Sequence, residues 1–182
     1  MKKVPTIFDR DWEGDRSRVL NKPHPECGWV FAGEGVATRK IDGTSCLVRD
    51  GKLFKRRELR KSDTAPPDFE VEDFDAETGK TVGWVPVTDD GSDRWHREAF
   101  TPGLSNGTYE LIGPKVQGNP EGYERHTLVR HDALVMVGQV PREFGALASW
   151  FAGKDIEGIV FHHPDGRMGK IKKRDFGLRR KD

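Results

Sequence analysis

Two Asp-Gly pairs constrain the fold of this chain most strongly. Asp42-Gly43 and Asp50-Gly51 each stand between short runs in which apolar and polar residues alternate. Glycine accepts the positive backbone φ that a tight turn requires, so these pairs favour hairpins. The runs Val36–Lys40, Ser45–Arg49 and Lys52–Arg56 are therefore predicted to form an antiparallel meander.

Helix is favoured in Arg142–Ala152 and is compatible with Asp9–Leu20. The segment Ser62–Pro102 is rich in Pro, Asp and Gly, but its spaced aromatic residues indicate packing onto the main sheet and not a disordered linker. The other predicted strands are short, and the last two form a closing hairpin; they are Gly107–Ile112, Thr127–Val137, Gly158–Phe161 and Met168–Lys172. This mixture predicts an α+β fold.

The composition bounds the size and setting of the protein. A chain of 182 residues suits one domain with a sizeable core, so residues 1–182 are predicted to form a single catalytic domain. The net charge of +1 argues against a polyanion-binding tail, although basic residues are dense in Lys52–Lys61 and Lys170–Lys181. The two cysteines lack the spacing of metal ligands, which fits a reducing compartment, and no apolar stretch is long enough to span a membrane. We therefore expect a soluble cytoplasmic protein with no membrane contact and no obligate protein partner.

The first chemical signal is Lys40-Ile41-Asp42-Gly43-Thr44, a lysine at a strand end with a glycine turn behind it. An amine nucleophile must lose its proton, which burial and nearby cations favour, and glycine lets a nucleotide approach the backbone closely. Taken alone, the motif is read more simply as a hairpin turn, because Lys-x-Asp-Gly arises often by chance.

Four further elements follow the lysine in a fixed order. They are Phe54-Lys55-Arg56-Arg57, Tyr109-Glu110-Leu111, Glu157-Gly158-Ile159-Val160 and Lys170-Ile171-Lys172. The order resembles that of the covalent nucleotidyltransferase superfamily of ATP-dependent polynucleotide ligases and capping enzymes. The resemblance covers Lys40–Lys172, which is most of the chain.

The segment Tyr109–Pro120 is similar to the small 5′-to-3′ RNA ligase family. The resemblance implies an antiparallel-sheet nucleotidyltransferase (adenylyltransferase) domain of the ATP-grasp-like ligase type. A single domain without an OB-fold is expected, since the chain ends at Asp182, soon after Lys172. The implied function is an RNA ligase of RNA repair, acting on RNA with 5′-phosphate and 3′-hydroxyl ends, with DNA as the other polymer to consider.

The resemblance also implies a role for each matching residue. Lys40 would attack the α-phosphate of ATP and hold AMP as a phosphoramidate. Lys170 and Lys172 would contact that phosphate and neutralise the charge that develops on its oxygens. Glu157 would ligate or orient Mg²⁺ (or Mn²⁺), and Glu110 would bind the ribose or support the same metal site, since hard cations prefer oxygen ligands.

Three further residues complete the implied nucleotide site: Arg39 beside the nucleophile, Arg56 as a contact to ribose or phosphate, and His131 in the strand expected to face the adenine. Each has a simpler reading. Arg56 fits a solvated strand end, His131 fits local packing, and the two terminal lysines fit a basic edge that discourages aggregation. The competing functions are a noncatalytic nucleic-acid-binding protein with a ligase-like fold, a DNA ligase and a capping-type nucleotidyltransferase.

Overall fold

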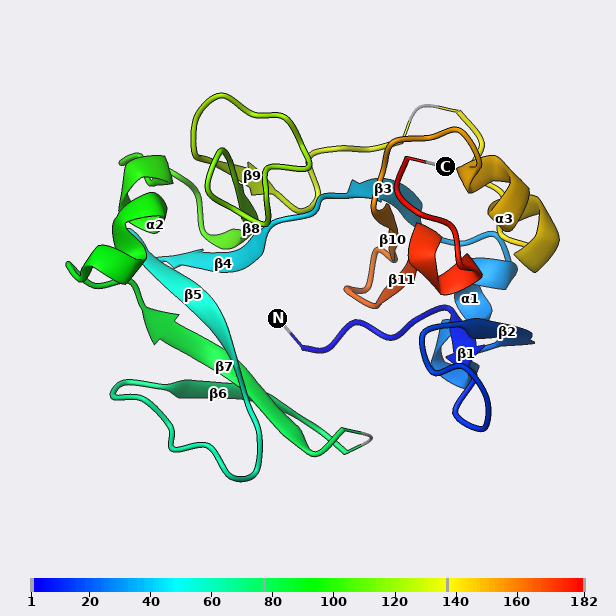
Figure 1. The fold of residues 1–182 in the computed structure, drawn as a ribbon, viewed down its shortest axis with the longest axis horizontal. Helices are drawn as coiled ribbons and strands as arrows, with labels where there is room; N and C mark the ends of the chain where they lie inside the picture. Colours follow the sequence, from blue (N-terminus) through cyan, green and yellow to red (C-terminus); the bar gives the residue numbers. More distant parts are fainter. Residues whose placement is uncertain (1, 77, 137, 182) are drawn as a thin grey trace. The chain divides into compact units, whose positions relative to one another are not determined.

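The structure is a computed structural model that describes residues 2–76, 78–136 and 138–181. The chain divides into two compact units, which are described one at a time (Figure 1). Unit 1 contains the residues up to Lys3 and Asp42–His131, and unit 2 contains Val4–Ile41 and the residues from Asp132 onward. Antiparallel strands and few helices confirm the α+β class.

Unit 1 is built on a six-stranded sheet. Its spatial order is β6-β7-β5-β4-β8-β9, and every neighbouring pair is antiparallel. The strands are β4 (Thr44–Arg49), β5 (Lys52–Leu59), β6 (Glu70–Asp75), β7 (Lys80–Pro86), β8 (Gly107–Ile112) and β9 (Thr127–Arg130). The predicted Asp50-Gly51 turn joins β4 to β5, with positive φ at both residues (50° and 73°).

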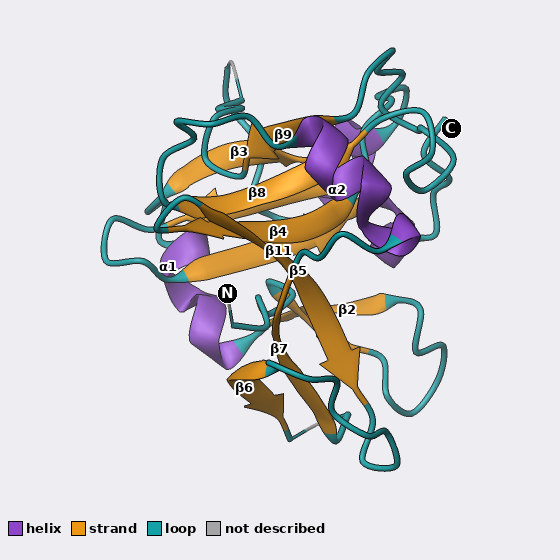
Figure 2. Ribbon diagram, turned by 90° about the vertical axis from the view of Figure 1, so that its left-hand side faces the viewer, coloured by secondary structure: helices purple, strands orange, loops and turns teal. Residues whose placement is uncertain are grey.

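One face of this sheet carries the apolar core of unit 1. Cys46, Tyr109 and Leu111 are buried and pack with Ala99 of α2 (Arg94–Ala99), which follows the 3-10 turn η2 (Gly91–Asp93). Figure 2 shows α2 beside β4 and β8 of this sheet. Side chains alternate along a strand, so the neighbours of these residues project from the opposite face. The aromatic segment joins the sheet as predicted through Trp84, which is 2% exposed.

Unit 2 contains a three-stranded antiparallel sheet of order β11-β10-β3 and a hairpin of β1 and β2. Its buried core includes Ile159, Phe161, Ile171 and Leu147. The strands are β1 (Phe8–Arg10), β2 (Val19–Pro23), β3 (Val36–Lys40), β10 (Gly158–His162) and β11 (Met168–Lys172). The helices are η1 (Pro25–Cys27), α1 (Gly28–Phe31), α3 (Phe144–Phe151) and η3 (Lys173–Phe176).

The prediction of one meander was wrong at its first turn. β3 pairs with β10, with Lys40 opposite Gly158, and not with β4. A side chain at Gly43 would place its Cβ 2.2 Å from the Leu111 carbonyl oxygen, so this glycine permits a close backbone approach in place of a hairpin turn. The later hairpin of β10 and β11 is confirmed.

The helix considered for Asp9–Leu20 was also wrong, because β1 and β2 occupy its ends. The Asp11 carboxylate accepts hydrogen bonds from the backbone N–H groups of Gly14 and Asp15, and this local bonding favours a turn over a helix. The strand predicted for Thr127–Val137 is shorter, since β9 ends at Arg130; Val137 itself lies outside the described residues. The helix predicted for Arg142–Ala152 is confirmed as α3.

We predict that Gly43→Ala lowers the free energy of unfolding by about 1–3 kcal/mol, because the added methyl group meets backbone and not a movable side-chain end. Urea denaturation of the whole chain measures the loss. Gly91→Ala is the matched control, because no heavy atom lies within 4 Å of its new Cβ. Equal stability of the two variants would contradict this account of Gly43.

Candidate active site

The register of the unit 2 sheet places two lysines on either side of one glycine. Lys40 ends β3 and Lys172 ends β11, and both are paired across the sheet with Gly158 of the central strand β10. A Cβ at Gly158 would lie 2.2 Å from the Ile171 carbonyl oxygen. The position therefore needs glycine, which also leaves no side chain between the two lysines.

Glu157 joins these lysines through its two carboxylate oxygens. Its Oε2 lies 2.5 Å from Lys40 Nζ, and its Oε1 lies 2.5 Å from Lys172 Nζ. The three side chains are 14–21% exposed, so a ligand from solvent has access to a group that is otherwise shielded. Charge-assisted hydrogen bonds between an ammonium group and a carboxylate are among the strongest polar contacts in proteins.

Burial alone would raise the pKa of Glu157, because it penalises the charged carboxylate. The positive charges of Lys40 and Lys172, with the hydrogen bonds they donate, outweigh burial and hold the pKa of Glu157 below its ordinary value. Glu157 is therefore a carboxylate at neutral pH, and the cluster carries one negative and two positive charges. That excess of positive charge suits a phosphate group.

Glu157 is also the one acidic side chain that this cluster offers to a metal ion. Among the described residues, no group of three or more His, Cys, Asp or Glu side chains comes together to form a metal cage. Mg²⁺ does not need one, since it is usually held by one or two carboxylates, substrate phosphates and water. The donor set fits a nucleotide-bound Mg²⁺ and does not fit a structural metal.

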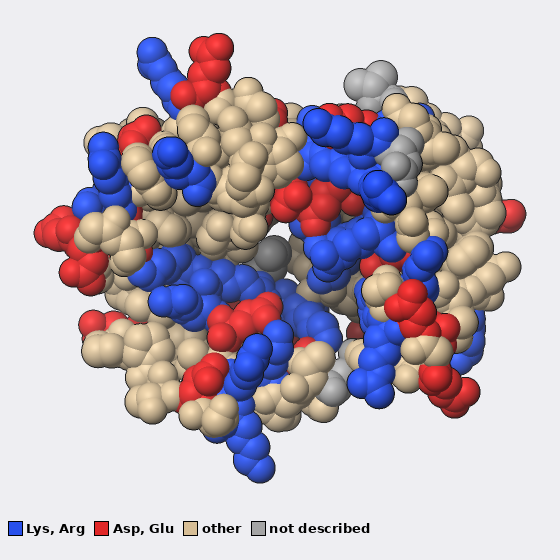
Figure 3. Space-filling view, in the orientation of Figure 1, with Lys and Arg blue, Asp and Glu red and all other residues tan. Residues whose placement is uncertain are grey.

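The other two predicted residues of unit 2 differ in their placement. Lys170 precedes Lys172 by two positions on β11, so both lysines project from the same face of the strand, as predicted. Arg39 alternates with Lys40 along β3, and its guanidinium donates to the Asp155 carbonyl oxygen at 3.4 Å. In the view of Figure 3, Lys and Arg side chains gather over β3 and β11.

The remaining predicted residues lie in unit 1. Glu110 on β8 is 8% exposed, and its Oε2 lies 2.7 Å from His131 Nε2. Arg56 is half-buried on β5, on the sheet face opposite the apolar core. Because Glu110, Arg56 and His131 belong to unit 1 and Lys40 belongs to unit 2, their shared role in one nucleotide site stays a prediction.

Two features of these units carried no signal that sequence reasoning used. Ser45 of β4 lies opposite Glu110 in the strand register, and both Ser45 Oγ and His131 Nδ1 are buried without a hydrogen-bond partner among the residues that the structure describes. Lys173 is 1% exposed, although it follows two lysines expected at the surface of the site. Lys173 is the first residue of η3, so the alternation of side chains along β11 says nothing about it, and its burial depends on contacts with distant parts of the chain.

We predict that Glu157→Gln destabilises the protein by about 1–3 kcal/mol at about pH 7, because two shielded ammonium groups lose the negative charge between them and one of them then faces an amide NH2 group that cannot accept a hydrogen bond. The pKa of Glu157 is lowered in the folded state, so its contribution to stability is present above pH 4.5, its ordinary pKa, and is lost as pH falls through the folded value. Urea denaturation across pH should show the difference between variant and wild type vanishing in acid. A difference that is independent of pH would contradict the bridging role.

Comparisons with known proteins associate this chain with RNA ligases. A family model described as RNA ligase 1 matches residues 99–182, a range that includes Glu110, Glu157 and Lys172 but not Lys40.

No helix among the described residues is long and apolar enough to cross a membrane.

Individual relatives carry the same name. The chain is 27% identical to RNA ligase 1 of Rattus norvegicus over 219 residues, a match that covers 79% of this chain and 67% of the relative. It is 31% identical to RNA ligase 1 of Danio rerio over 139 residues, covering 57% of this chain and 42% of the relative. RNA ligase 1 of Pongo abelii is 28% identical over 219 residues, with 79% and 67% covered. These similarities support an RNA ligase function.

Proposed function

We propose that this protein is an ATP-dependent RNA ligase that forms a covalent lysyl-AMP intermediate on Lys40. The observation that carries the proposal is the Glu157 carboxylate held at 2.5 Å from both Lys40 and Lys172. These contacts bring Lys40, Lys172 and Glu157 together, which supports their proposed roles as amine nucleophile, phosphate-binding cation and carboxylate of one site. The similarity to RNA ligase 1 proteins supports the choice of RNA as the polymer.

The proposed reaction has three steps. In the first, the neutral amine of Lys40 attacks the α-phosphorus of ATP, so that an N–P bond forms, the bond to the bridging oxygen of the β-phosphate breaks and pyrophosphate leaves. In the second, a 5′-phosphate oxygen of RNA attacks the same phosphorus and Lys40 departs, leaving AMP on the RNA end. In the third, the 3′-hydroxyl attacks the 5′-phosphorus, AMP leaves and a phosphodiester is formed.

The ion pair between Lys40 and Glu157 describes the protein before this chemistry begins. Lys40 must leave the carboxylate and lose its proton before it can attack, since an ammonium group has no lone pair. Lys172 lies on the other side of the same carboxylate, where it can neutralise negative charge on the α-phosphate oxygens in the transition state.

Glu157 is the residue of unit 2 proposed to hold Mg²⁺ or Mn²⁺ together with the ATP phosphates. When bound, such an ion would withdraw charge from the phosphate oxygens and so favour attack. Glu110, Arg56 and His131 are proposed as contacts to the nucleoside part, with Glu110 also able to support the metal. These assignments rest on the sequence resemblance, and the close pairing of Glu110 with His131 supports treating those two residues as one group.

We predict that Lys40→Ala abolishes transfer of label from α-³²P-ATP to the protein, because Lys40 is the proposed amine donor. Lys40→Arg should fail equally, since a guanidinium is not deprotonated in proteins. Denaturing gels measure the labelled protein. Lys22→Ala is the matched control, since this lysine of unit 2 has a 70% exposed side chain that pairs with Asp9 away from the site.

Normal labelling of Lys40→Ala would refute the proposed nucleophile. Absence of labelling in the wild-type protein, combined with retained binding of RNA, would favour a noncatalytic nucleic-acid-binding protein.

We predict that the protein, given ATP and Mg²⁺, seals single-stranded or looped RNA with 5′-phosphate and 3′-hydroxyl ends faster than the matching DNA. The 2′-hydroxyl is the group by which a small site can recognise an RNA end. A third substrate, DNA with one ribonucleotide at its 3′ end, locates the preference. Rescue of sealing by that ribonucleotide would place the recognition at the 3′ end, whereas equal rates on all three substrates would contradict a preference for RNA.

A further inference from the structure

We propose that Lys173 is a positioning residue that holds Glu157 between Lys40 and Lys172. Lys173 follows Lys172 directly, and its side chain is buried, with 1% of the residue exposed. An ammonium group loses much of its hydration when it is buried, and an apolar side chain would fill the same space without that cost. The burial of Lys173 therefore has to be explained by what its ammonium contacts.

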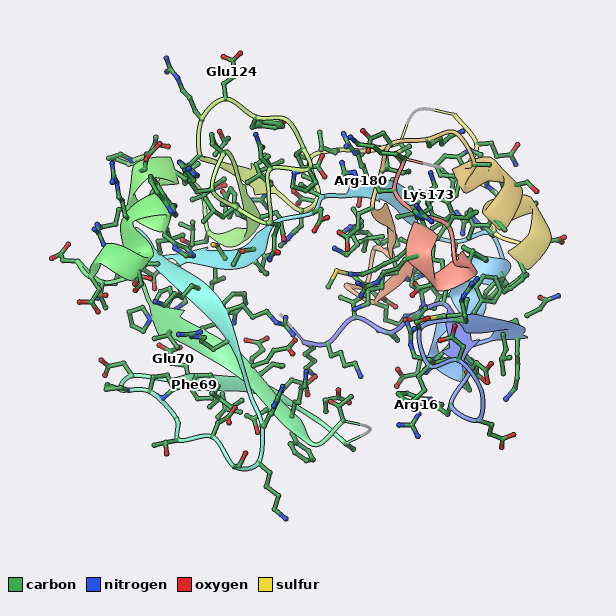
Figure 4. The ribbon with its side chains drawn as sticks, in the orientation of Figure 1. Arg16, Phe69, Glu70, Glu124, Lys173 and Arg180 are labelled. Carbon is green, nitrogen blue, oxygen red and sulfur yellow. The ribbon has the colours of Figure 1, made fainter. Side chains whose placement is uncertain are left out.

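The Lys173 ammonium donates to two backbone carbonyl groups that are far apart in sequence. Lys173 Nζ lies 2.8 Å from the Lys154 carbonyl oxygen and 2.9 Å from the Arg180 carbonyl oxygen. Figure 4 shows the labelled Lys173 and Arg180 close together in the C-terminal segment of unit 2. The ammonium thus links the chain before Glu157 to the chain after η3.

The backbone of Lys173 contacts the same loop. Its N–H donates to the Glu157 carbonyl oxygen at 2.9 Å. Glu157 needs such support because α3 ends at Phe151 and β10 begins at Gly158, so the loop that carries the carboxylate has no helix or strand of its own. Lys173 therefore contacts this loop at two points, Lys154 and Glu157.

Two nearby contacts also fix the loop that carries Glu157 and the strand end that carries Lys172. Arg180 Nε donates to Asp155 Oδ1 at 2.7 Å, which fixes the middle of the loop to the C-terminal segment. The Lys172 N–H donates to Asp175 Oδ2 at 2.8 Å, so η3 also holds the backbone of Lys172, the second lysine of the site. Lys173 lies between these contacts and acts on the site through Glu157, without contacting the reacting atoms.

The kinetic test of this inference rests on the proposed function, because it follows the labelling of the protein by α-³²P-ATP. It compares Lys173→Met with wild type under single-turnover conditions. Methionine replaces most of the apolar part of the lysine side chain and removes the ammonium. We expect the rate constant at saturating ATP to fall about 10- to 100-fold, the scale typical of a misplaced catalytic group. A loss of folded protein alone would lower the labelled fraction and leave the rate constant unchanged.

The matched control is Leu147→Ala, which removes a fully buried side chain of α3 in the same unit. It should lower stability and leave the rate constant of the folded fraction at the wild-type value. Hydrogen exchange followed by mass spectrometry gives a readout that needs no ATP. Exchange in residues 152–158 should rise in Lys173→Met beyond any rise elsewhere in unit 2.

A wild-type rate constant in Lys173→Met, or unchanged exchange in residues 152–158, would overturn the positioning role. If the wild-type protein takes up no label, the proposed function fails, while hydrogen exchange still decides whether Lys173 holds the Glu157 loop. The two failures are therefore distinguishable.

Discussion

The site depends on one carboxylate that is shared by two ammonium groups. Without Glu157, Lys40 and Lys172 would face each other across Gly158 as shielded like charges, which is unfavourable. Glu157 makes that arrangement stable while it leaves a net positive charge. The same contacts that stabilise the fold therefore prepare the group for a ligand with more negative charge, such as a nucleotide phosphate.

The backbone around this carboxylate is arranged to keep it in place. Gly158 lets β10 and β11 approach each other closely, since a Cβ there would meet the Ile171 carbonyl oxygen at 2.2 Å. The buried Lys173 then ties down the loop that precedes β10. Contacts that fix a charged side chain in advance lower the reorganisation that a reaction requires, so Lys173 acts on the proposed reaction although it does not contact the reacting atoms.

Sequence alone predicted the parts of this structure that depend on local rules. The Asp50-Gly51 turn and α3 followed from backbone geometry and from residue pattern. The partner of β3 did not, because an Asp-Gly pair that closes a hairpin and one that permits close packing look the same in sequence. Likewise, the spacing of Lys170 and Lys172 predicted a shared face, whereas the bridge from Glu157 depends on contacts distant in the chain.

The proposed lysyl-AMP intermediate is tested by measuring the mass of the intact protein after incubation with ATP and Mg²⁺, followed by peptide mapping. We expect a gain of one adenylyl group, carried on Lys40 as a phosphoramidate that is lost in acid and retained in alkali. Pyrophosphate should remove the group, since the first step is reversible. No gain in mass, or an adenylyl group on another residue, would contradict the proposal that Lys40 is the nucleophile.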